Sequence, residues 1–267
     1  LISMVSDSEN ILFLETEKVG QYFDLETHSV IFDRYEFAGR LCQGLRALEV
    51  GCGSGIGLEY LSNLSKTFVA LEYSHQNVRL LESKDVGSAR VFQGDAHETN
   101  FGDGSFDLII GLAMVYYLDL SKFLCEASRL LDTEGKLFFC TSNKDVPGFC
   151  EAPGTTHYYS IPELNSELTR AGFEVEFFGA FPKDSGGLKT RRFKAFIKNT
   201  MKSFFELTNL GSHLWENLRL KSLGKLYPLP SKITKANIQS RHRVRLVSDY
   251  PDFTHRVIYV VAKKRAI

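Results

Sequence analysis

Short apolar runs alternate with amphipathic stretches along most of the chain, which predicts strands and helices in turn. The predicted strands are residues 46–50, 67–72, 89–93, 106–110, 136–141, 173–181 and 256–262. The predicted helices are residues 56–65, 75–84, 119–132 and 161–171, after a broken helical pattern over 8–44 with a turn at 24–28. This alternation is typical of a mostly parallel sheet with helices on both faces. Right-handed crossovers then favour a doubly wound, Rossmann-like topology.

A glycine-rich turn, residues 51–57, follows the first predicted strand. Glycines at alternate positions let the backbone approach a ligand closely, and the helix that starts there offers free N–H groups. In an open parallel sheet this turn lies at the carboxyl ends of the strands, where ligands bind. The turn does not fit the dinucleotide pattern G-x-G-x-x-G, because Ile56 or Leu58 stands where the third glycine is needed. No lysine follows it, as a P-loop would require.

Further motifs follow the glycine turn at regular intervals. In chain order the set is Glu49–Gly55, Glu72, Gly94–Ala96, Ser105–Asp107 and Arg129–Leu137. This set, across residues 46–142, resembles the class I S-adenosylmethionine-dependent methyltransferases, in the small-molecule branch called type 11. The sequence departs from the family pattern at Thr133 and Glu134, where relatives have proline and glycine in a loop that touches no ligand.

The resemblance implies S-adenosylmethionine as cofactor and S-adenosylhomocysteine as product. Glu72 would accept both ribose hydroxyl protons, which suits a carboxylate, and Asp95 would bind the adenine amino group. Glu49 would either help to bind the amino group of the cofactor or orient the glycine loop. Cys52 is expected to be a small loop residue and not a nucleophile. The full set of expected cofactor-binding residues is Glu49, Gly51, Cys52, Gly53, Gly55, Glu72, Tyr73, Asp95, Ala96 and Gly111.

The methyl acceptor is expected above the ends of the fourth and fifth strands, under the N-terminal helices. Tyr116 and Tyr117 stand where relatives often carry a histidine pair, and they would either position the acceptor or pack a helix. Tyr22 and Phe23 resemble the aromatic pair of an entry helix that closes over the cofactor, or they belong to the core. His157 is the first candidate for a general base, although relatives have a similar histidine as a framework feature. No carboxylate cluster for a metal is evident, so no metal is expected.

Charge is unevenly distributed along the chain. Residues 1–181 hold 13 basic and 27 acidic residues, residues 182–254 hold 15 basic and 5 acidic, and the remainder holds 4 basic, which balances to zero. We therefore expect a methyltransferase core with an N-terminal helical cap over 1–181 and a basic helical insertion over 182–254. Residues 255–267 would supply the final strand, and the resemblance implies that it is the antiparallel seventh strand of the sheet.

The basic insertion has two stretches with helical periodicity, residues 189–207 and 212–220. It would form a lid over the substrate, or its cations would meet an anionic, sugar, lipid or carrier-linked acceptor. An amphipathic basic helix could instead lie on a membrane surface. A solvated surface attracted to the acidic core is a further interpretation of the same charges. Nucleic acid is not expected, because no RNA-binding motif accompanies the patch.

Composition places the chain among globular proteins, at 43% hydrophobic and 24% charged residues. Five cysteines without C-x-x-C spacing favour a reducing, cytoplasmic compartment. The first residues lack a secretory pattern, and no apolar run is long enough for a membrane span. The leading hypothesis is a methyltransferase that acts on a small molecule, with oxygen favoured over nitrogen or carbon as the atom that is methylated. A non-catalytic binding protein on the same fold is the alternative, and a nicotinamide dehydrogenase is disfavoured by the failed glycine pattern.

Overall fold

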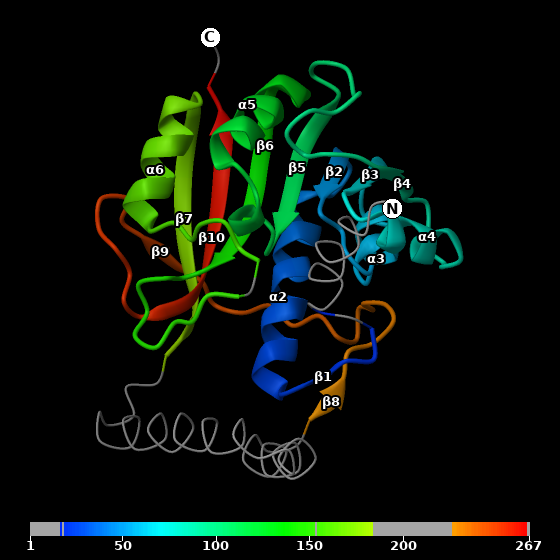
Figure 1. Cartoon of the computed structure of the whole chain (residues 1–267), viewed down its shortest axis with the longest axis horizontal. Helices are drawn as coiled ribbons and strands as arrows, with labels where there is room; N and C mark the ends of the chain where they lie inside the picture. The colour runs from blue at the N-terminus through cyan, green and yellow to red at the C-terminus, as the bar shows by residue number, and fades with distance from the viewer. Residues whose placement is uncertain (1–16, 18, 153, 184–225, 266–267) are drawn as a thin grey trace, which may run out of the picture.

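An eight-stranded sheet forms the centre of the computed structural model, which describes residues 17, 19–152, 154–183 and 226–265. Its strand order is β4-β3-β2-β5-β6-β10-β7-β9 (Figure 1). The bounds are β2 Arg46–Val50, β3 Thr67–Glu72, β4 Arg90–Gln93, β5 Phe106–Leu112, β6 Leu131–Ser142, β7 Phe173–Pro182, β9 Val244–Leu246 and β10 His255–Lys264. The first five strands in this order, from β4 at the edge to β6, are parallel to one another. Strand β10 is antiparallel to both of its neighbours, β6 and β7. The predicted sheet is confirmed, and β9 adds an eighth strand to the expected seven.

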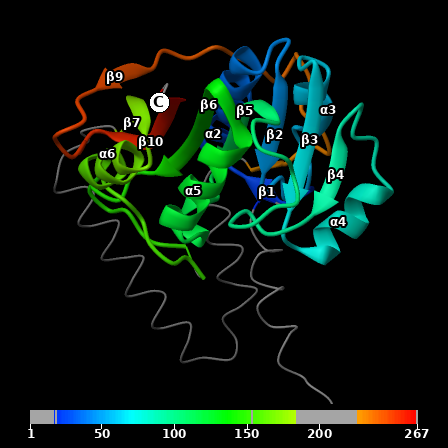
Figure 2. The ribbon, with the colours of Figure 1, turned by 90° about the horizontal axis from the view of Figure 1, so that it is seen from above.

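Helices cover both faces of this sheet (Figure 2). Their bounds are α2 Leu25–Leu41, α3 Leu58–Ser62, α4 His75–Glu82, α5 Leu120–Leu130 and α6 Ile161–Arg170, with a short 3-10 turn at Val115–Tyr117. Two apolar cores result. One packs α5 and α6 on the sheet through residues such as Leu124 and Leu164, and the other packs α2 and α3 through Ile31 and Leu61. The fold therefore has three layers, with the ends of the parallel strands left between the helices.

The start of α2 corrects one prediction. Residues 24–28 do not form a turn, because Asp24 is the N-cap of α2 and its side chain accepts a hydrogen bond from the Thr27 N–H at 2.7 Å. An aspartate before an apolar stretch suits both a turn and a helix N-cap, and the following buried face of α2 decides for the helix.

A second correction concerns the aromatic pair before α2. Tyr22 and Phe23 lie on a strand, β1 (Tyr22–Phe23), and not on an entry helix. This strand pairs antiparallel with β8 (Tyr227–Pro228), which joins the N-terminal region to the chain that returns from the basic segment. Residues 8–16 of the predicted N-terminal helical region lie outside the described residues.

The two helices predicted within the basic segment, 189–207 and 212–220, also lie outside the described residues. Residues 226–254 are described, and they return along the acidic core with the strands β8 and β9. Several of their cations form ion pairs with that core, as the attraction between opposite charges predicts. These pairs join Lys232 to Glu59 at 2.7 Å, Arg243 to Asp33 at 2.7 Å and Arg245 to Glu176 at 2.8 Å.

Arg243 is the centre of a buried polar network that fastens this returning segment to α2 and β10. Its Nη2 donates to Asp33 Oδ1 at 2.7 Å and to Glu36 Oε2 at 2.8 Å. The Tyr259 hydroxyl donates to the second Asp33 oxygen at 2.6 Å, and the guanidinium lies 4.3 Å from the centroid of the Phe37 ring. All of these partners except Phe37 are buried, so each charge depends on the others for compensation.

No helix in the described ranges has both the length and the apolar character needed to cross a membrane.

Candidate functional site

The glycine turn connects β2 to α3 and lies at the carboxyl end of the parallel strands. Gly53 and Gly55 have positive φ values of 53° and 71°. A Cβ on Gly55 would lie 2.3 Å from Leu81 Cδ2, so that position needs glycine for packing. A Cβ on Gly53 would meet no atom of the described residues within 4 Å, so those residues leave this part of the turn open. The backbone is therefore accessible to a ligand at Gly53.

Glu72, at the end of β3, holds the glycine turn in place. Its Oε2 accepts a hydrogen bond from the Gly53 N–H at 2.8 Å. Its Oε1 accepts from the Ser74 N–H at 2.9 Å and from Asn77 Nδ2 at 3.3 Å. A carboxylate has about four lone-pair positions, so Oε2 keeps one for a further donor while both positions of Oε1 are used. One ribose hydroxyl can thus be accepted without rearrangement, which is fewer than the two that the resemblance implies.

Asp95 follows β4 and is fixed by a residue that the sequence did not single out, His97. Asp95 Oδ1 lies 2.7 Å from His97 Nδ1 and accepts the His97 backbone N–H at 2.9 Å. The other ring nitrogen, Nε2, accepts the backbone N–H of Asp119 at 3.0 Å. Because a backbone N–H can only donate, the ring proton must lie on Nδ1, where it faces Asp95. Asp119 is the N-cap of α5, so this chain of contacts ties Asp95 to a helix on the far side of its loop.

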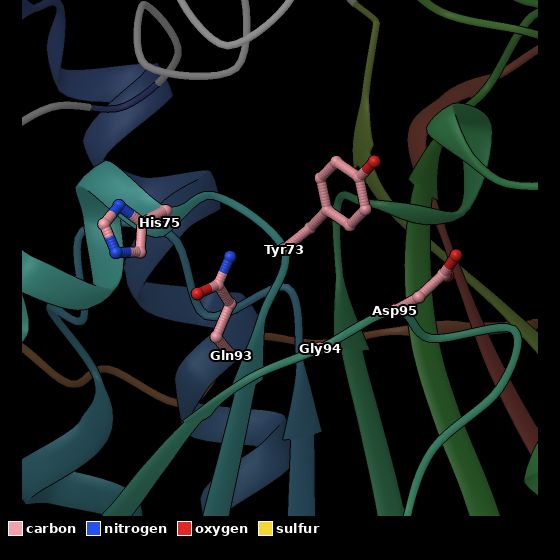
Figure 3. Close-up of a pocket in the computed structure, with 5 residues that line it drawn as sticks. All are labelled: Tyr73, His75, Gln93, Gly94 and Asp95. Atoms are coloured by element: carbon pink, nitrogen blue, oxygen red, sulfur yellow. The ribbon is translucent and has the colours of Figure 1, made fainter.

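A pocket of about 460 Å³ lies beside these carboxylates. It is lined by Tyr73, His75, Gln93, Gly94 and Asp95. Figure 3 shows Tyr73 and Asp95 projecting from the ends of β3 and β4, with Gln93 and His75 beside them. Two of these residues, Tyr73 and Asp95, are among the ten expected cofactor-binding residues. Glu72 immediately precedes Tyr73 in the chain. An exposed aromatic ring next to a carboxylate suits a ligand with a flat base and an amino group.

Glu49 is buried beneath the glycine turn, and within the described part of the chain neither of its carboxylate oxygens has a hydrogen-bond partner. Burial raises the pKa of Glu49, the Tyr35 hydroxyl opposes the increase and the neighbouring Glu72 adds to it, so that the pKa is about 8. A carboxyl group with this pKa is mostly neutral at pH 7. Both alternatives for Glu49, a contact with the cofactor and orientation of the loop, remain predictions.

The raised pKa of Glu49 predicts a pH-dependent cost to stability. Because the folded-state value of about 8 exceeds the ordinary 4.5, the folded chain binds a proton more tightly than the unfolded chain between these pH values. Stability should therefore fall as pH rises from 4.5 to 8. Glu49→Gln, which is always neutral, should gain stability over the wild type across that range and keep a constant advantage above pH 8. Urea unfolding at pH 5, 7 and 9 measures this, and a difference independent of pH would contradict it.

The other expected cofactor residues occupy less open positions. Cys52 is buried, and burial raises the pKa of its thiol well above the ordinary value, which is consistent with a loop residue that is not a nucleophile. Ala96 is also buried. Gly111 pairs with Val50 in the sheet, and a Cβ there would lie 3.1 Å from Met114 Sδ. Gly111 thus makes room for Met114 beside the glycine turn.

The expected acceptor residues fall into two separate groups. Tyr116 is buried and stacks on Tyr158 with ring centroids 4.6 Å apart, and Tyr117 packs against it at 4.9 Å. Burial raises the pKa of Tyr116, so its phenol stays protonated and is unsuited to be a base. Tyr22 lies apart, exposed on β1.

His157 lies on an exposed loop and packs edge-on against Tyr159, with ring centroids 4.5 Å apart. The loop is tied to the 3-10 turn that follows β5, because the Tyr116 carbonyl accepts the Thr156 N–H at 2.8 Å. The structure therefore brings His157 into the neighbourhood of Tyr116 through the backbone, whereas no described contact joins its ring to the cofactor pocket. Its role as a base stays a prediction.

Asp107 of the Ser105–Asp107 motif has a structural position away from the pocket. It lies at the start of β5, where its carboxylate accepts from the Arg46 backbone N–H at 2.8 Å and from Arg46 Nη2 at 2.6 Å. Arg46 Nη2 also contacts Asp132 Oδ2 at 2.8 Å. The motif thus clamps the amino ends of β2, β5 and β6.

In the described part of the chain, no three His, Cys, Asp or Glu side chains lie close enough together to hold a metal ion.

The fold and the site define a Rossmann-like domain that binds a nucleoside-containing ligand at the carboxyl ends of its strands. Residues 48–139 match a protein-family model described as a methyltransferase domain. The chain is 27% identical over 154 residues to a probable S-adenosylmethionine-dependent methyltransferase of Mycolicibacterium smegmatis, which covers 56% of this chain and 58% of that protein. A probable S-adenosylmethionine-dependent methyltransferase of Mycobacterium tuberculosis is 29% identical over 185 residues, covering 65% and 66%. The chain thus spans less than two thirds of the length of these relatives.

Solved structures show the same fold. A methyltransferase from Thermotoga maritima, described as a possible histamine N-methyltransferase, has a TM-score of 0.55 at 15% identity and covers 90% of this chain and 92% of its own. A methyltransferase from Archaeoglobus fulgidus has a TM-score of 0.54 at 16% identity, covering 90% and 94%. These likenesses show the fold, and the family match shows that residues 48–139 are similar to a methyltransferase domain.

Proposed function

We propose that the chain is an active enzyme that transfers the methyl group of S-adenosylmethionine to a small-molecule acceptor, preferably to oxygen. The observation that carries this proposal is the bond from the Gly53 N–H to Glu72 Oε2, beside a pocket that Asp95 also lines. A protein that had lost turnover would not need to keep the glycine turn, the expected ribose carboxylate Glu72 and the expected adenine carboxylate Asp95 together at one site. This supports turnover over the alternative of a binding protein on a methyltransferase fold.

The residues present fit the cofactor. The described residues leave Gly53 open, Glu72 Oε2 has a position for one more donor, and both described contacts of Asp95 use Oδ1. Asp95 Oδ2 would therefore accept the adenine amino group, and Tyr73 would cover the base or ribose. Glu49, neutral and buried under the turn, would orient the loop or contact the amino end of the cofactor.

When bound, the cofactor supplies a methyl group activated by a sulfonium. The chain then has to hold the acceptor in line with that group, so orientation supplies much of the rate. The rigid glycine turn, held by Glu72 from one side and packed on Leu81 from the other, would fix one end of this line. A general base is needed only where the acceptor is protonated, and His157 is our candidate for that role.

The class of acceptor is suggested by the relatives and by charge. The ubiquinone biosynthesis O-methyltransferase of Azorhizobium caulinodans is 29% identical over 155 residues, covering 51% of this chain and 61% of that protein, which favours an oxygen acceptor. Acceptors with an anionic, sugar, lipid or carrier-linked part suit the basic segment, and peripheral contact with a membrane would suit it as well. We keep the organisation of residues 1–181 as core, 182–254 as basic insertion and 255–267 as final strand, and we infer a cytoplasmic enzyme without a nucleic-acid partner.

Calorimetric titration tests the proposal directly. S-adenosylmethionine and S-adenosylhomocysteine should both bind with micromolar affinity, and NADH should not bind. Mass spectrometry should then detect a mass gain of one methylene in acceptors from a panel of hydroxylated and carboxylated small molecules. Absence of binding by both sulfur nucleosides would overturn the proposal. Binding without transfer to any member of the panel would favour the non-catalytic alternative.

His97 should influence cofactor binding although it would not touch the cofactor. His97→Ala removes the proton donor that holds Asp95 Oδ1, so affinity for S-adenosylhomocysteine should fall by about tenfold, the size of one charge-assisted hydrogen bond. His97→Asn places an amide N–H near the Nδ1 position and should restore part of the affinity. The exposed His242 is the matched control, and His242→Ala should leave affinity unchanged. Equal affinity for wild type and His97→Ala would contradict the positioning role.

A further inference from the structure

Arg34 of α2 is a buried cation at the end of the sheet where methyl transfer is proposed. Its charge lies close enough to Tyr116, which follows β5, and to Cys140, near the end of β6, to oppose the rise that burial causes in the pKa of both groups. The next residue, Tyr35, packs on the glycine turn, where a Cβ on Gly57 would lie 2.0 Å from the Tyr35 ring. Arg34 therefore lies between the glycine turn and the ends of β5 and β6.

The described hydrogen-bond partner of the buried Arg34 is a partly exposed residue, Glu17. Arg34 Nη2 donates to Glu17 Oε1 at 2.6 Å, and the Arg34 side chain is 5% exposed whereas that of Glu17 is 40% exposed. The Glu17 carboxylate thus reaches from the surface to a buried cation. Glu17 also has a positive φ of 57°, which is unfavourable for a residue with a side chain. The Glu17 carbonyl accepts a hydrogen bond from Ser54 Oγ of the glycine turn at 3.2 Å.

One edge of the Arg34 guanidinium is only half used. Its Nε is buried and has no hydrogen-bond partner among the described residues. Nε and Nη2 lie on the same edge of a guanidinium and together match one carboxylate, as Arg46 shows where both atoms contact Asp107 Oδ1 at 3.0 Å and 2.6 Å. Glu17 meets Nη2 alone. A buried donor without a partner beside an incompletely matched carboxylate indicates a site built for a better-fitting anion.

We propose that Arg34 anchors a carboxylate group of the methyl acceptor and that the Glu17 carboxylate occupies this anion site until the acceptor displaces it. This inference rests on the proposed function, because it assigns the class of acceptor for the same site. A carboxylate on Nε and Nη2 would satisfy the unpartnered donor and keep the charge of Arg34 compensated. The Glu17 side chain, already partly in solvent, would be released to water at small cost. The anchored carboxylate serves for recognition, and the methyl group is transferred to a different atom of the acceptor.

Direct binding of simple aromatic anions tests this anchor. Benzoate is titrated calorimetrically into the full chain saturated with S-adenosylhomocysteine, with benzamide as the neutral isostere and phenyl phosphate as the other anion. Wild type should bind benzoate and not benzamide. Glu17→Gln removes the competing charge and should raise benzoate affinity by about tenfold, the effect of one charge-assisted contact. The matched control is Glu167→Gln, which neutralises one member of an exposed glutamate–arginine pair with Arg170 and should change nothing.

A second variant separates the anchor from the general charge of the site. Arg34→Lys in the Glu17→Gln background keeps the positive charge and loses the fork, so it should cancel the gain in benzoate affinity. Unchanged affinity for S-adenosylhomocysteine in each variant confirms that the fold is intact.

The outcomes that overturn the inference are distinct from failure of the proposed function. Equal benzoate affinity in wild type and Glu17→Gln, or equal binding of benzamide and benzoate, would show that Glu17 does not guard an anion site. Loss of S-adenosylhomocysteine binding in Glu17→Gln alone would make the pair a clip for the glycine turn. Tighter binding of phenyl phosphate than of benzoate would overturn the carboxylate assignment. Failure of the wild type to bind S-adenosylhomocysteine would instead overturn the proposed function, and benzoate titration without it would still test the anchor.

Discussion

Glu72→Gln is expected to lower the affinity for S-adenosylmethionine by at least about 100-fold and to lower the free energy of unfolding by about 1–3 kcal/mol. The buried carboxylate accepts backbone N–H groups on both of its oxygens, from Gly53 at 2.8 Å and from Ser74 at 2.9 Å. A glutamine amide has one oxygen, so in either orientation its NH₂ group must face a donor. The glycine turn then loses its support together with the position that would accept a ribose hydroxyl.

Calorimetry for the affinity and urea unfolding for the stability measure these two effects of Glu72→Gln. Glu82→Gln is the control, because Glu82 is an exposed glutamate at the end of α4, the helix that Ser74 caps. It should leave both quantities unchanged. A Glu72→Gln variant that binds S-adenosylmethionine as the wild type does would remove Glu72 from the cofactor site.

Arg243→Met is expected to lower the free energy of unfolding by about 3–5 kcal/mol, the usual cost of leaving buried charges unpaired. Asp33 and Glu36 both lose their contacts with Nη2, and Asp33 keeps only the Tyr259 hydroxyl as a described side-chain partner. The methionine chain preserves most of the packing against Phe37, so the loss is mainly electrostatic. Arg245→Met, which breaks an exposed pair with Glu176, should cost about 0–1 kcal/mol.

The loss in Arg243→Met should depend on pH in a defined direction. Burial raises the pKa of Asp33 above its ordinary value even with Arg243 present, and removal of the cation should raise it further. Below that raised pKa the Asp33 carboxyl is neutral and needs no cation. The difference in unfolding free energy between variant and wild type should therefore be largest near neutral pH and shrink as pH falls. Urea unfolding from pH 7 to pH 4 measures it, and a difference that grows towards acid would contradict the role of Asp33.

The central strands could be predicted closely from the sequence because each is a short apolar run between turn residues. The predicted strands 46–50 and 67–72 coincide with β2 and β3. Buried parallel strands are apolar on both faces, so local composition is sufficient to locate them. The strand β9 was missed because it is only three residues long, with an arginine between two apolar residues, and it forms by pairing with the edge of β7. Edge strands of this kind depend on tertiary contacts that no local pattern contains.

The candidate site divides in the same way. Glu72 and Asp95 could be located because motif spacing places them at the ends of consecutive strands. His97 carried only the weak signal of following Asp95 by two residues, and its role depends on the Asp119 N–H, 22 residues further along the chain. Arg34 and Arg243 are ordinary arginines in the sequence. Arg34 is paired with Glu17, 17 residues away, and Arg243 with Asp33, 210 residues away. No local sequence pattern reveals such distant partners.

The position of β10 has a consequence for synthesis on the ribosome. This strand lies between β6 and β7 but is translated after both, beyond the whole basic segment. At about 5–20 residues per second, several seconds pass between completion of β7 at Pro182 and completion of β10 at Lys264. During that interval β6 presents an unpaired edge and β7 has no neighbour from the central sheet, a state that invites pairing with other nascent chains. The nascent chain should therefore depend on chaperones until its last strand closes the sheet.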